Sequence, residues 1–226
     1  MKFRPFRDGD TFATFRNVTE NTKKEIMDLD NEYVLKASIA ELEKYFSDKG
    51  MIEPLVLHTD KYYIHSYMPV YDKLFQYYRD DNINVLEIGV QKGGSLYLWS
   101  KYFQNASVFG IDIEDSPAWL KNISNITTFK ENAYSRRGIN LFEDKTLDIL
   151  IDDGPHTLDS MKYISRNYLY KMKKYGLVVI EDIPQLHWIK KILDEIPYDI
   201  DYKYEIHDLR EKKNRFDDIM LVILIT

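Results

Sequence analysis

The sequence contains no cysteine, few glycines and no long apolar run. The absence of cysteine among 226 residues excludes a disulfide framework, a thiolate nucleophile and cysteine-ligated zinc or iron–sulfur sites. No stretch of about 18 apolar residues occurs, so no membrane span is expected. The charged start, MKFRPFRDGD, lacks the apolar core of a secretory signal. We therefore expect a cytoplasmic protein.

Basic residues are also in the minority. Lys and Arg total 31 against 37 Asp and Glu, which gives a net charge of −6. Because binding to nucleic acid depends on a basic surface, no nucleic-acid partner is expected. Hydrophobic residues make up 44% of the chain and include 18 tyrosines, which is typical of a globular protein with a sizeable core.

The pattern of apolar residues changes near residue 82. Before this point, residues 20–48 and 66–80 carry apolar side chains at helical spacing, with Pro69 in the first turn of the second segment. Residues 1–81 are therefore predicted to be a helical cap that could also form the surface of a homodimer. Residues 82–226 are predicted to form the main domain, in one compact unit with the cap.

After residue 82, short apolar runs alternate with helical patterns. Strands are expected at 84–90, 107–113, 126–131, 146–153, 176–183, 201–209 and 217–226. Helices are expected at 95–103, 157–174 and 186–195. This alternation predicts an α/β fold with a Rossmann-like, doubly wound, mainly parallel seven-stranded sheet. The last strand is expected to be antiparallel, because only a short polar link precedes it.

The first strand leads into a glycine-containing turn, LEIGVQKGGS. Gly89 and Gly93 would let the backbone approach a ligand closely, and a helix is expected to begin near Ser95. The spacing G-x-x-x-G-G differs from the G-x-G-x-x-G of dinucleotide-binding enzymes. Glu87, inside the strand end, would disfavour a pyrophosphate and suits a cationic or hydroxylated ligand.

An acid ends the second strand. Asp112 follows Gly89 by 23 residues, close to the roughly 20-residue offset at which an acid meets ribose hydroxyls in such folds. A structural turn and a surface aspartate are the alternative interpretation. The two features together favour a nucleoside site.

These segments, LEIGVQKGGSLYLW and VFGIDI, resemble the first motif and second strand of class I S-adenosylmethionine-dependent methyltransferases. The resemblance implies that Glu87 and Gly89 lie beside the methionyl part of the cofactor and that Asp112 binds its ribose. It also places Asn132 and Ala133 near the adenine. The remaining residues expected to contact the cofactor are Gly93, Ser95 and Asp152.

Carboxylates follow the fourth and fifth predicted strands, in IDDGPH and IEDI. Because neighbouring parallel strands end at one edge of a sheet, Asp153, Glu181 and Asp182 should converge there. Three carboxylates without thiols suit a hard cation: Mg²⁺, Mn²⁺ or Ca²⁺. His156 could accept a proton from a hydroxyl held beside Asp153. An Asx turn and a helix N-cap are the structural alternatives.

The pairing of IDDG-x-H with IED resembles the macrocin- and mycinamicin-type sugar O-methyltransferases and the related cephalosporin-hydroxylase-like group, from about residue 58 onward. The resemblance implies that Asp153, Glu181 and Asp182 hold Mg²⁺ and that His156 is the general base. Pro155 is a departure, since serine is common there.

The segment from His58 to Tyr67 resembles the part of this family that precedes the first motif. It would fold over the cofactor, where Lys61 and His65 could meet the methionyl carboxylate or the substrate. A helix cap with packing tyrosines is the alternative. Asp217 and Asp218, before the last strand, are interpreted as turn acids.

The expected function is methyl transfer from S-adenosylmethionine to a hydroxyl of a sugar, sugar nucleotide or similar polyol. Biosynthesis of a bacterial surface glycan (capsule) or of a natural product is the expected setting. An NAD(P)-dependent oxidoreductase is one alternative, for which Tyr170 and Lys174 give a Y-x-x-x-K match. A non-catalytic partner subunit with the same fold is the other.

Overall fold

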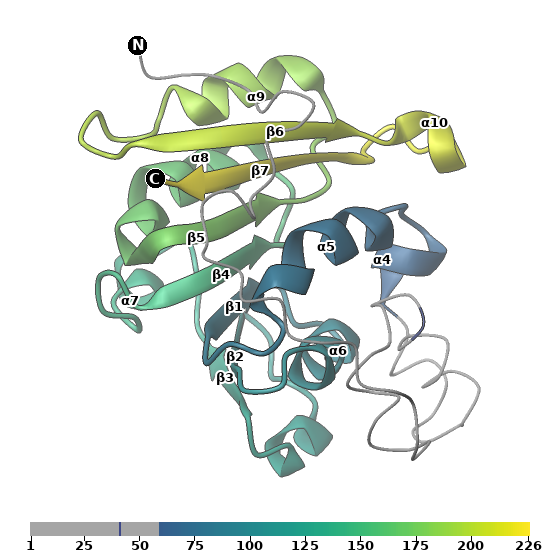
Figure 1. Cartoon of the computed structure of the whole chain (residues 1–226), viewed down its shortest axis with the longest axis vertical. Coiled ribbons are helices and arrows are strands. Elements are labelled where there is room, and N and C mark those ends of the chain that lie inside the picture. The colour runs from purple at the N-terminus through teal and green to yellow at the C-terminus, as the bar shows by residue number, and fades with distance from the viewer. Residues whose placement is uncertain (1–40, 42–58) are drawn as a thin grey trace.

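A seven-stranded sheet forms the centre of the molecule (Figure 1). The structure is a computed structural model that describes Glu41 and residues 59–226, so the helices expected within residues 20–48 lie outside the described residues. The strands are β1 (Asn84–Ile88), β2 (Ser107–Asp112), β3 (Ile126–Lys130), β4 (Leu147–Asp152), β5 (Met172–Ile180), β6 (Tyr202–Asp208) and β7 (Ile219–Ile225).

The strand order is β3-β2-β1-β4-β5-β7-β6. Strands β1 to β5 pair in parallel, whereas β7 pairs antiparallel with both β5 and β6. The predicted Rossmann-like sheet with an antiparallel last strand is therefore confirmed, and each predicted strand is present. Insertion of β7 between β5 and β6 leaves β3 and β6 at the two edges.

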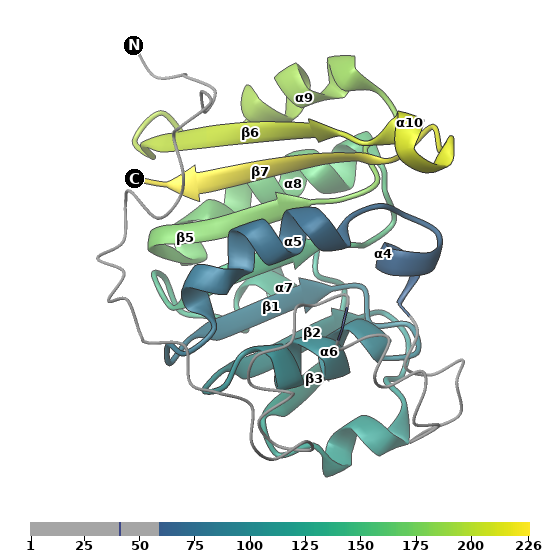
Figure 2. The same ribbon diagram turned by 45° about the vertical axis from the view of Figure 1, so that its right-hand side comes forward.

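Helices cover both faces of the sheet. In chain order the helical elements are α4 (Asp60–Tyr63), α5 (Met68–Phe75), η2 (Gln76–Tyr78), α6 (Gly94–Tyr102), η3 (Ala118–Asn122), α7 (Arg136–Ile139), α8 (Leu158–Asn167), η4 (Tyr168–Lys171), α9 (Leu186–Leu193) and α10 (Arg210–Lys213). Figure 2 shows α5 and α6 in front of the sheet and α8 behind it. In the part of the chain that the structure describes, no helix is both long and apolar enough to cross a membrane.

Alternation of side chains along the strands produces two cores. On β4, Ile149 and Ile151 face the core shared with α5 and α6, whereas Leu150 faces the core shared with α8 and α9. All three side chains are fully buried. A strand that is covered on both faces has a nearly continuous run of apolar residues. For this reason the run LDILID predicted a strand of this sheet.

The described end of the expected cap packs into the first of these cores. Tyr71 and Phe75 of α5 lie against Trp99 of α6, with ring centroids 5.2 and 5.4 Å away. Aromatic pairs at such distances are stabilising beyond the apolar area that they bury. Residues 59–81 therefore share a hydrophobic core with the residues that follow them.

One predicted boundary is wrong. The helix expected over 157–174 ends at Asn167, and β5 begins at Met172, four residues before the predicted start. Met172 is buried and pairs with Leu147 of β4. Burial of this side chain in the sheet outweighs the helical pattern of the preceding tyrosines and lysines.

Candidate active site

The carboxyl ends of β1, β4 and β5 lie side by side and carry most of the predicted site residues. The backbone N–H of Asp153 donates to Ile88 O at 2.9 Å, and that of Glu181 donates to Asp152 O at 3.1 Å. These bonds continue the strand pairing by one residue. Ligands of open α/β sheets bind at this edge, so the fold places these acids where chemistry is expected.

The turn after β1 requires glycine. Gly89 has φ +94°, and a Cβ there would collide with the carbonyl oxygen of Asp153. The backbone N–H groups of Val90 and Gln91 donate to Asp112 Oδ2 at 2.7 and 3.0 Å. Asp112 therefore links the turn to the end of β2 by hydrogen bonds. The same residue also lines the larger of the two cavities described next.

Two cavities open on this turn. The larger, of about 620 Å³, is lined by Gly89, Asp112, Asn132, Ala133 and Asp153, among others. The smaller, of about 440 Å³, is lined by Gly89, Gly93, Ser95 and Asp153. The structure therefore brings together these residues, all of which the sequence singled out.

The ionisation of Asp112 suits a ribose contact. Burial by itself would raise the pKa of this carboxyl, but hydrogen bonds from the backbone N–H groups of Glu114 and Val90 outweigh it and hold the pKa below its usual range. An ionised carboxylate accepts hydrogen bonds from hydroxyls. Asp112 as the ribose ligand stays a prediction.

Glu87 and Asp152 were expected to contact the cofactor, and both are buried behind the cavities. Burial raises the pKa of Glu87 to about 7, although Lys61 opposes the shift. Burial also raises the pKa of Asp152 to about 7, opposed by the Tyr134 hydroxyl, which donates to Asp152 Oδ1. Neither residue is among those lining the two cavities. Their contacts with a cofactor stay predictions.

Asp153, His156 and Asp182 form a compact group. One ligand atom from each residue lies within 4.8 Å of the others. His156 Nε2 is 3.7 Å from Asp153 Oδ1 and 3.4 Å from Asp182 Oδ2, and the imidazole side chain is 36% exposed. Burial raises the pKa of Asp182, opposed by a hydrogen bond from Tyr67. Two carboxylates with open positions toward solvent fit a hard divalent cation.

Glu181, the third predicted metal ligand, is not one of the three residues of this group. Its Oε2 accepts a hydrogen bond from Lys61 Nζ at 2.6 Å, and its Oε1 accepts one from the hydroxyl of Tyr71. The side chain is buried. Since each carboxylate oxygen has two lone pairs, these bonds leave room for a further interaction. Glu181 as a metal ligand stays a prediction.

Lys61 was expected to meet a carboxylate of the cofactor, and in the structure it binds carboxylates of the chain itself. Its Nζ is hydrogen-bonded to Asp153 Oδ2 and Glu181 Oε2 and lies 3.3 Å from Glu87 Oε1. Burial by itself would lower the pKa of Lys61, but the neighbouring carboxylates outweigh it and raise the pKa well above its ordinary value. The ammonium is therefore charged.

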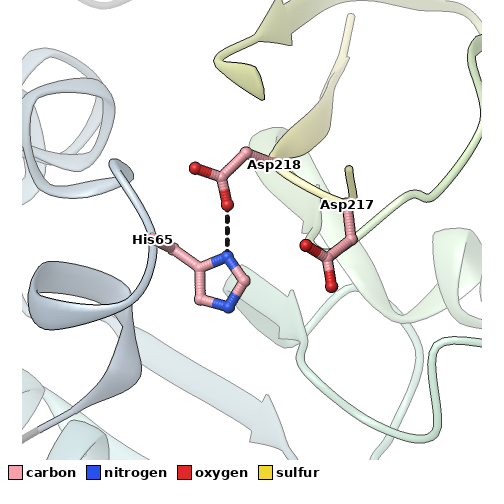
Figure 3. A group of neighbouring side chains, drawn as sticks. All are labelled: His65, Asp217 and Asp218. Carbon is pink, nitrogen blue, oxygen red and sulfur yellow. Dashed lines mark hydrogen bonds and ion pairs between the residues drawn. The ribbon is translucent and has the colours of Figure 1, made fainter. Parts of the chain in front are cut away.

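His65 lies outside both cavities and pairs with the start of β7. Its Nδ1 is hydrogen-bonded to Asp218 Oδ1, and Asp217 lies beside this pair (Figure 3). Asp217 lies in the turn before β7, as expected, whereas Asp218 directly follows that turn and is fully buried. A buried carboxylate is tolerated when it has a partner, and His65 is that partner.

Three tyrosine hydroxyls complete the site, and no sequence pattern indicated their polar role. Tyr67 donates to Asp182 Oδ1, Tyr71 to Glu181 and Tyr134 to Asp152. Tyr67 and Tyr71 are four residues apart in SYMPVY, a spacing that places both on one face of a helix. That spacing was consistent with packing tyrosines and could not indicate a polar partner.

Tyr170 and Lys174, the Y-x-x-x-K match, lie at the other end of β5. The Tyr170 hydroxyl donates to Asp199, and Lys174 Nζ lies over the ring of Tyr175. Because β5 runs from Met172 to Ile180, this pair is far along the strand from Asp182. The pair therefore gives the oxidoreductase alternative no support.

Similar sequences come from curated O-methyltransferases. Over 138 residues, 58% of this chain and 36% of the relative, the chain is 30% identical to the 8-demethyl-8-alpha-L-rhamnosyl tetracenomycin-C 2'-O-methyltransferase of Streptomyces olivaceus. It is 30% identical to demethylmacrocin O-methyltransferase of Streptomyces fradiae over 55% of this chain and 33% of that one. Mycinamicin VI 2''-O-methyltransferase of Micromonospora griseorubida is 29% identical, over 56% and 33%.

The chain thus spans about a third of the length of these relatives. No model of a protein family matches it. Among solved structures, the MycE methyltransferase of the mycinamycin biosynthetic pathway, in complex with Mg and SAH, has a TM-score of 0.61 at 20% identity, covering 84% of this chain and 55% of that one. A complex of MycE with Mg, SAH and mycinamycin VI has a TM-score of 0.53 at 25% identity, covering 69% and 39%.

The similarity to these proteins in sequence and structure agrees with the order of the strands in the sheet. It also agrees with the family resemblance that the sequence motifs indicate. The chain has the class I methyltransferase fold, and its sequence is similar to that of the macrocin- and mycinamicin-type O-methyltransferases.

Proposed function

We propose that this chain is a metal-dependent O-methyltransferase that moves a methyl group from S-adenosylmethionine to a hydroxyl of a sugar or similar polyol. The observation that carries the proposal is the compact group of Asp153, His156 and Asp182 beside two cavities at the carboxyl ends of the strands. The names of the relatives, which are O-methyltransferases, support it.

S-adenosylmethionine would occupy the space around the glycine turn. The larger cavity has polar groups suited to a nucleoside, with Asp112 for the ribose and Asn132 and Ala133 for the adenine. The smaller cavity is lined by Gly93 and Ser95 at the start of α6, and the N-terminus of a helix favours an anion such as the methionyl carboxylate. The SAH in the MycE complexes supports this assignment.

A divalent cation, Mg²⁺ or in its place Mn²⁺ or Ca²⁺, would be held by Asp153 and Asp182, with Glu181 as the predicted third ligand. The donor set fits, because carboxylate oxygens are the ligands that these ions take in proteins. When bound, such an ion lowers the pKa of a coordinated hydroxyl and orients it. The Mg in the MycE complexes supports this choice of ion.

The residues of the chain would supply proton transfer and alignment. His156 Nε2 would accept the proton of the acceptor hydroxyl, and the hydroxyl oxygen would take the methyl group from the sulfonium, leaving S-adenosylhomocysteine. Alignment of the two reacting groups supplies the largest share of the acceleration. Asp153 and Asp182, each with a carboxylate oxygen near Nε2, would stabilise the imidazolium that forms.

The acceptor is proposed to carry two adjacent hydroxyls, because a bound cation can hold both. A rhamnosyl group in the name of one relative supports a sugar, and the mycinamycin biosynthetic pathway to which MycE belongs supports a natural product. A surface-glycan or sugar-nucleotide acceptor, a cytoplasmic location and a homodimer stay predictions. Light scattering of the purified chain tests the dimer.

The test is a methyl-transfer assay with labelled S-adenosylmethionine and a panel of nucleotide sugars and glycosylated natural products. We expect turnover with Mg²⁺, none with EDTA, and recovery when Mg²⁺ is restored. Calorimetry with S-adenosylhomocysteine in EDTA is the control, and binding should survive there. Full turnover in EDTA would remove the metal from the mechanism. Binding without turnover on any acceptor would favour a non-catalytic partner subunit.

A further inference from the structure

Lys61 is a buried cation enclosed by acids from three adjacent strands. Its side chain is 1% exposed, and its Nζ contacts Glu87 of β1, Asp153 after β4 and Glu181 after β5. Lysine is almost never fully buried unless it is paired. Burial in this position therefore depends on the carboxylates, and the carboxylates in turn depend on the single ammonium between them.

Lys61 also determines which oxygen of Asp153 is available. Its Nζ binds Oδ2, whereas Oδ1 of the same carboxylate faces His156 Nε2 at 3.7 Å. When one oxygen of an aspartate carboxylate is bound by a buried partner, the carboxylate cannot rotate freely about its Cβ–Cγ bond. The contact with Lys61 therefore keeps Oδ1 turned toward the compact group.

Asp182 is held in the same way from the same segment. Tyr67 donates to its Oδ1, and its Oδ2 faces His156 Nε2 at 3.4 Å. Each aspartate of the compact group thus has one oxygen bound by a side chain of residues 61–67 and the other turned toward the imidazole. Tyr67 is neutral, whereas the ammonium of Lys61 also compensates the negative charge of the carboxylates around it. Lys61 therefore makes the larger contribution to holding the two aspartates in place.

We propose that Lys61 is a positioning residue of the metal site, which holds Asp153 with Oδ1 presented to the cation. This role rests on the proposed function. Without the ammonium, the buried Glu87 and Glu181 and the half-buried Asp153 would face one another with uncompensated negative charge, and a carboxylate with access to solvent turns toward water. This change removes Asp153 from its place beside Asp182 and weakens metal binding.

The test measures binding of Mn²⁺ directly, by the electron paramagnetic resonance signal of the free ion, in the full chain with saturating S-adenosylhomocysteine. We expect Lys61→Met to weaken Mn²⁺ binding at least tenfold, and Lys61→Arg, which keeps the charge, to bind more tightly than Lys61→Met. Lys190→Met removes an exposed lysine ion-paired with Asp194 on the surface and is the matched control, with unchanged Mn²⁺ binding. Affinity for S-adenosylhomocysteine should stay within about threefold in all three variants.

A second pair of variants covers the case in which Lys61→Met does not fold. Lys61→Met/Glu87→Gln removes one acid together with the ammonium, and Glu87 lies outside the group of Asp153, His156 and Asp182. We expect the double variant to fold and still to lose Mn²⁺ affinity, whereas Glu143→Gln, which removes an exposed acid, keeps it. Circular dichroism establishes folding in each case.

The outcomes separate this role from the proposed function. Wild-type affinity for Mn²⁺ in folded Lys61→Met, or in the double variant, would overturn the positioning role and leave the methyltransferase proposal intact. A lower melting temperature with unchanged Mn²⁺ affinity would show a purely structural lysine and would likewise overturn it. Failure of the unmodified chain to bind Mn²⁺ would overturn the metal-dependent function and this role together.

Discussion

His156 and Asp182 face each other across the ends of two strands, with Nε2 and Oδ2 3.4 Å apart, and both residues have left-handed backbones, with φ +51° and +52°. Residues other than glycine rarely adopt such angles, and the strain persists where surrounding structure enforces it. The turns after β4 and β5 therefore hold the imidazole and the carboxylate in contact at the expense of local backbone stability.

Replacement of His156 by Ala tests the proton acceptor. We expect turnover to fall by roughly 10²–10⁴-fold, the range associated with loss of a general base, while S-adenosylhomocysteine binding is retained. His187→Ala, at an exposed position on α9, is the matched control and should be neutral. An unchanged rate in His156→Ala would assign the proton to solvent or to a neighbouring acid.

Replacement of Asp112 by Ala tests the cofactor cavity. The change removes a predicted ribose ligand and also the acceptor for two backbone N–H groups of the glycine turn. We expect calorimetry to show S-adenosylhomocysteine affinity weakened by at least about tenfold, since hydrogen bonds to charged groups are among the stronger ones. Asp115→Ala, on the exposed surface beyond β2, is the control. Equal affinity in the two variants would place the ribose elsewhere.

Replacement of the two turn glycines, Gly89 and Gly93, by alanine should lower the stability of the chain by different amounts. In Gly89→Ala the new Cβ meets the backbone carbonyl of Asp153, which cannot move without disturbing β4, whereas in Gly93→Ala it meets the end of the Leu120 side chain. Strain of about 1–3 kcal/mol is expected at each left-handed position, with an additional loss at Gly89. Chemical denaturation should therefore rank Gly89→Ala as the less stable. The reverse order would contradict the close approach of β1 and β4.

The raised pKa of Glu87 predicts how stability depends on pH. This pKa is about 7 in the folded chain, against an ordinary value of 4.5. The folded chain thus holds the proton more tightly than the unfolded chain, so the contribution of Glu87 to stability is lost as pH rises from about 4.5 through 7. Glutamine does not titrate.

Thermal melts of metal-free Glu87→Gln and wild-type chains should therefore diverge with pH. We expect the difference in melting temperature to move in favour of the variant as pH rises through that window. Glu143→Gln, at an exposed position, should show no such trend. A difference that is constant across the window would contradict the raised pKa.

The strands and the acids at their ends could be predicted because both are local properties of the sequence. Apolar runs such as LDILID report burial on both faces, and the topology of parallel strands brings IDDG and IED to one edge. Residues at this edge, including Asp153 and Asp182, are therefore placed by the fold class alone. The start of β5 was misplaced because the burial of Met172 depends on its partner Leu147 across the sheet.

The partners of these acids could not be predicted, because they come from a distant part of the chain. Lys61 is 92 residues from Asp153, and His65 is 153 residues from Asp218. No local pattern fixes how residues 59–71 lie across the strand ends. The motif suggested a cofactor or substrate as the partner of Lys61 and His65, and the structure shows internal carboxylates as their partners. Their contacts with a cofactor or substrate stay predictions.

The contact between His65 and Asp218 has a consequence for synthesis of the chain. A ribosome makes residues 59–71 before any of the acids that they bind, and Asp218 is made after all six other strands of the sheet. Contacts so distant along the chain form slowly, because the intervening residues must be ordered first. His65 therefore cannot reach its buried partner until Asp218 has left the exit tunnel, so the polar interior of the nascent protein is completed last at β7.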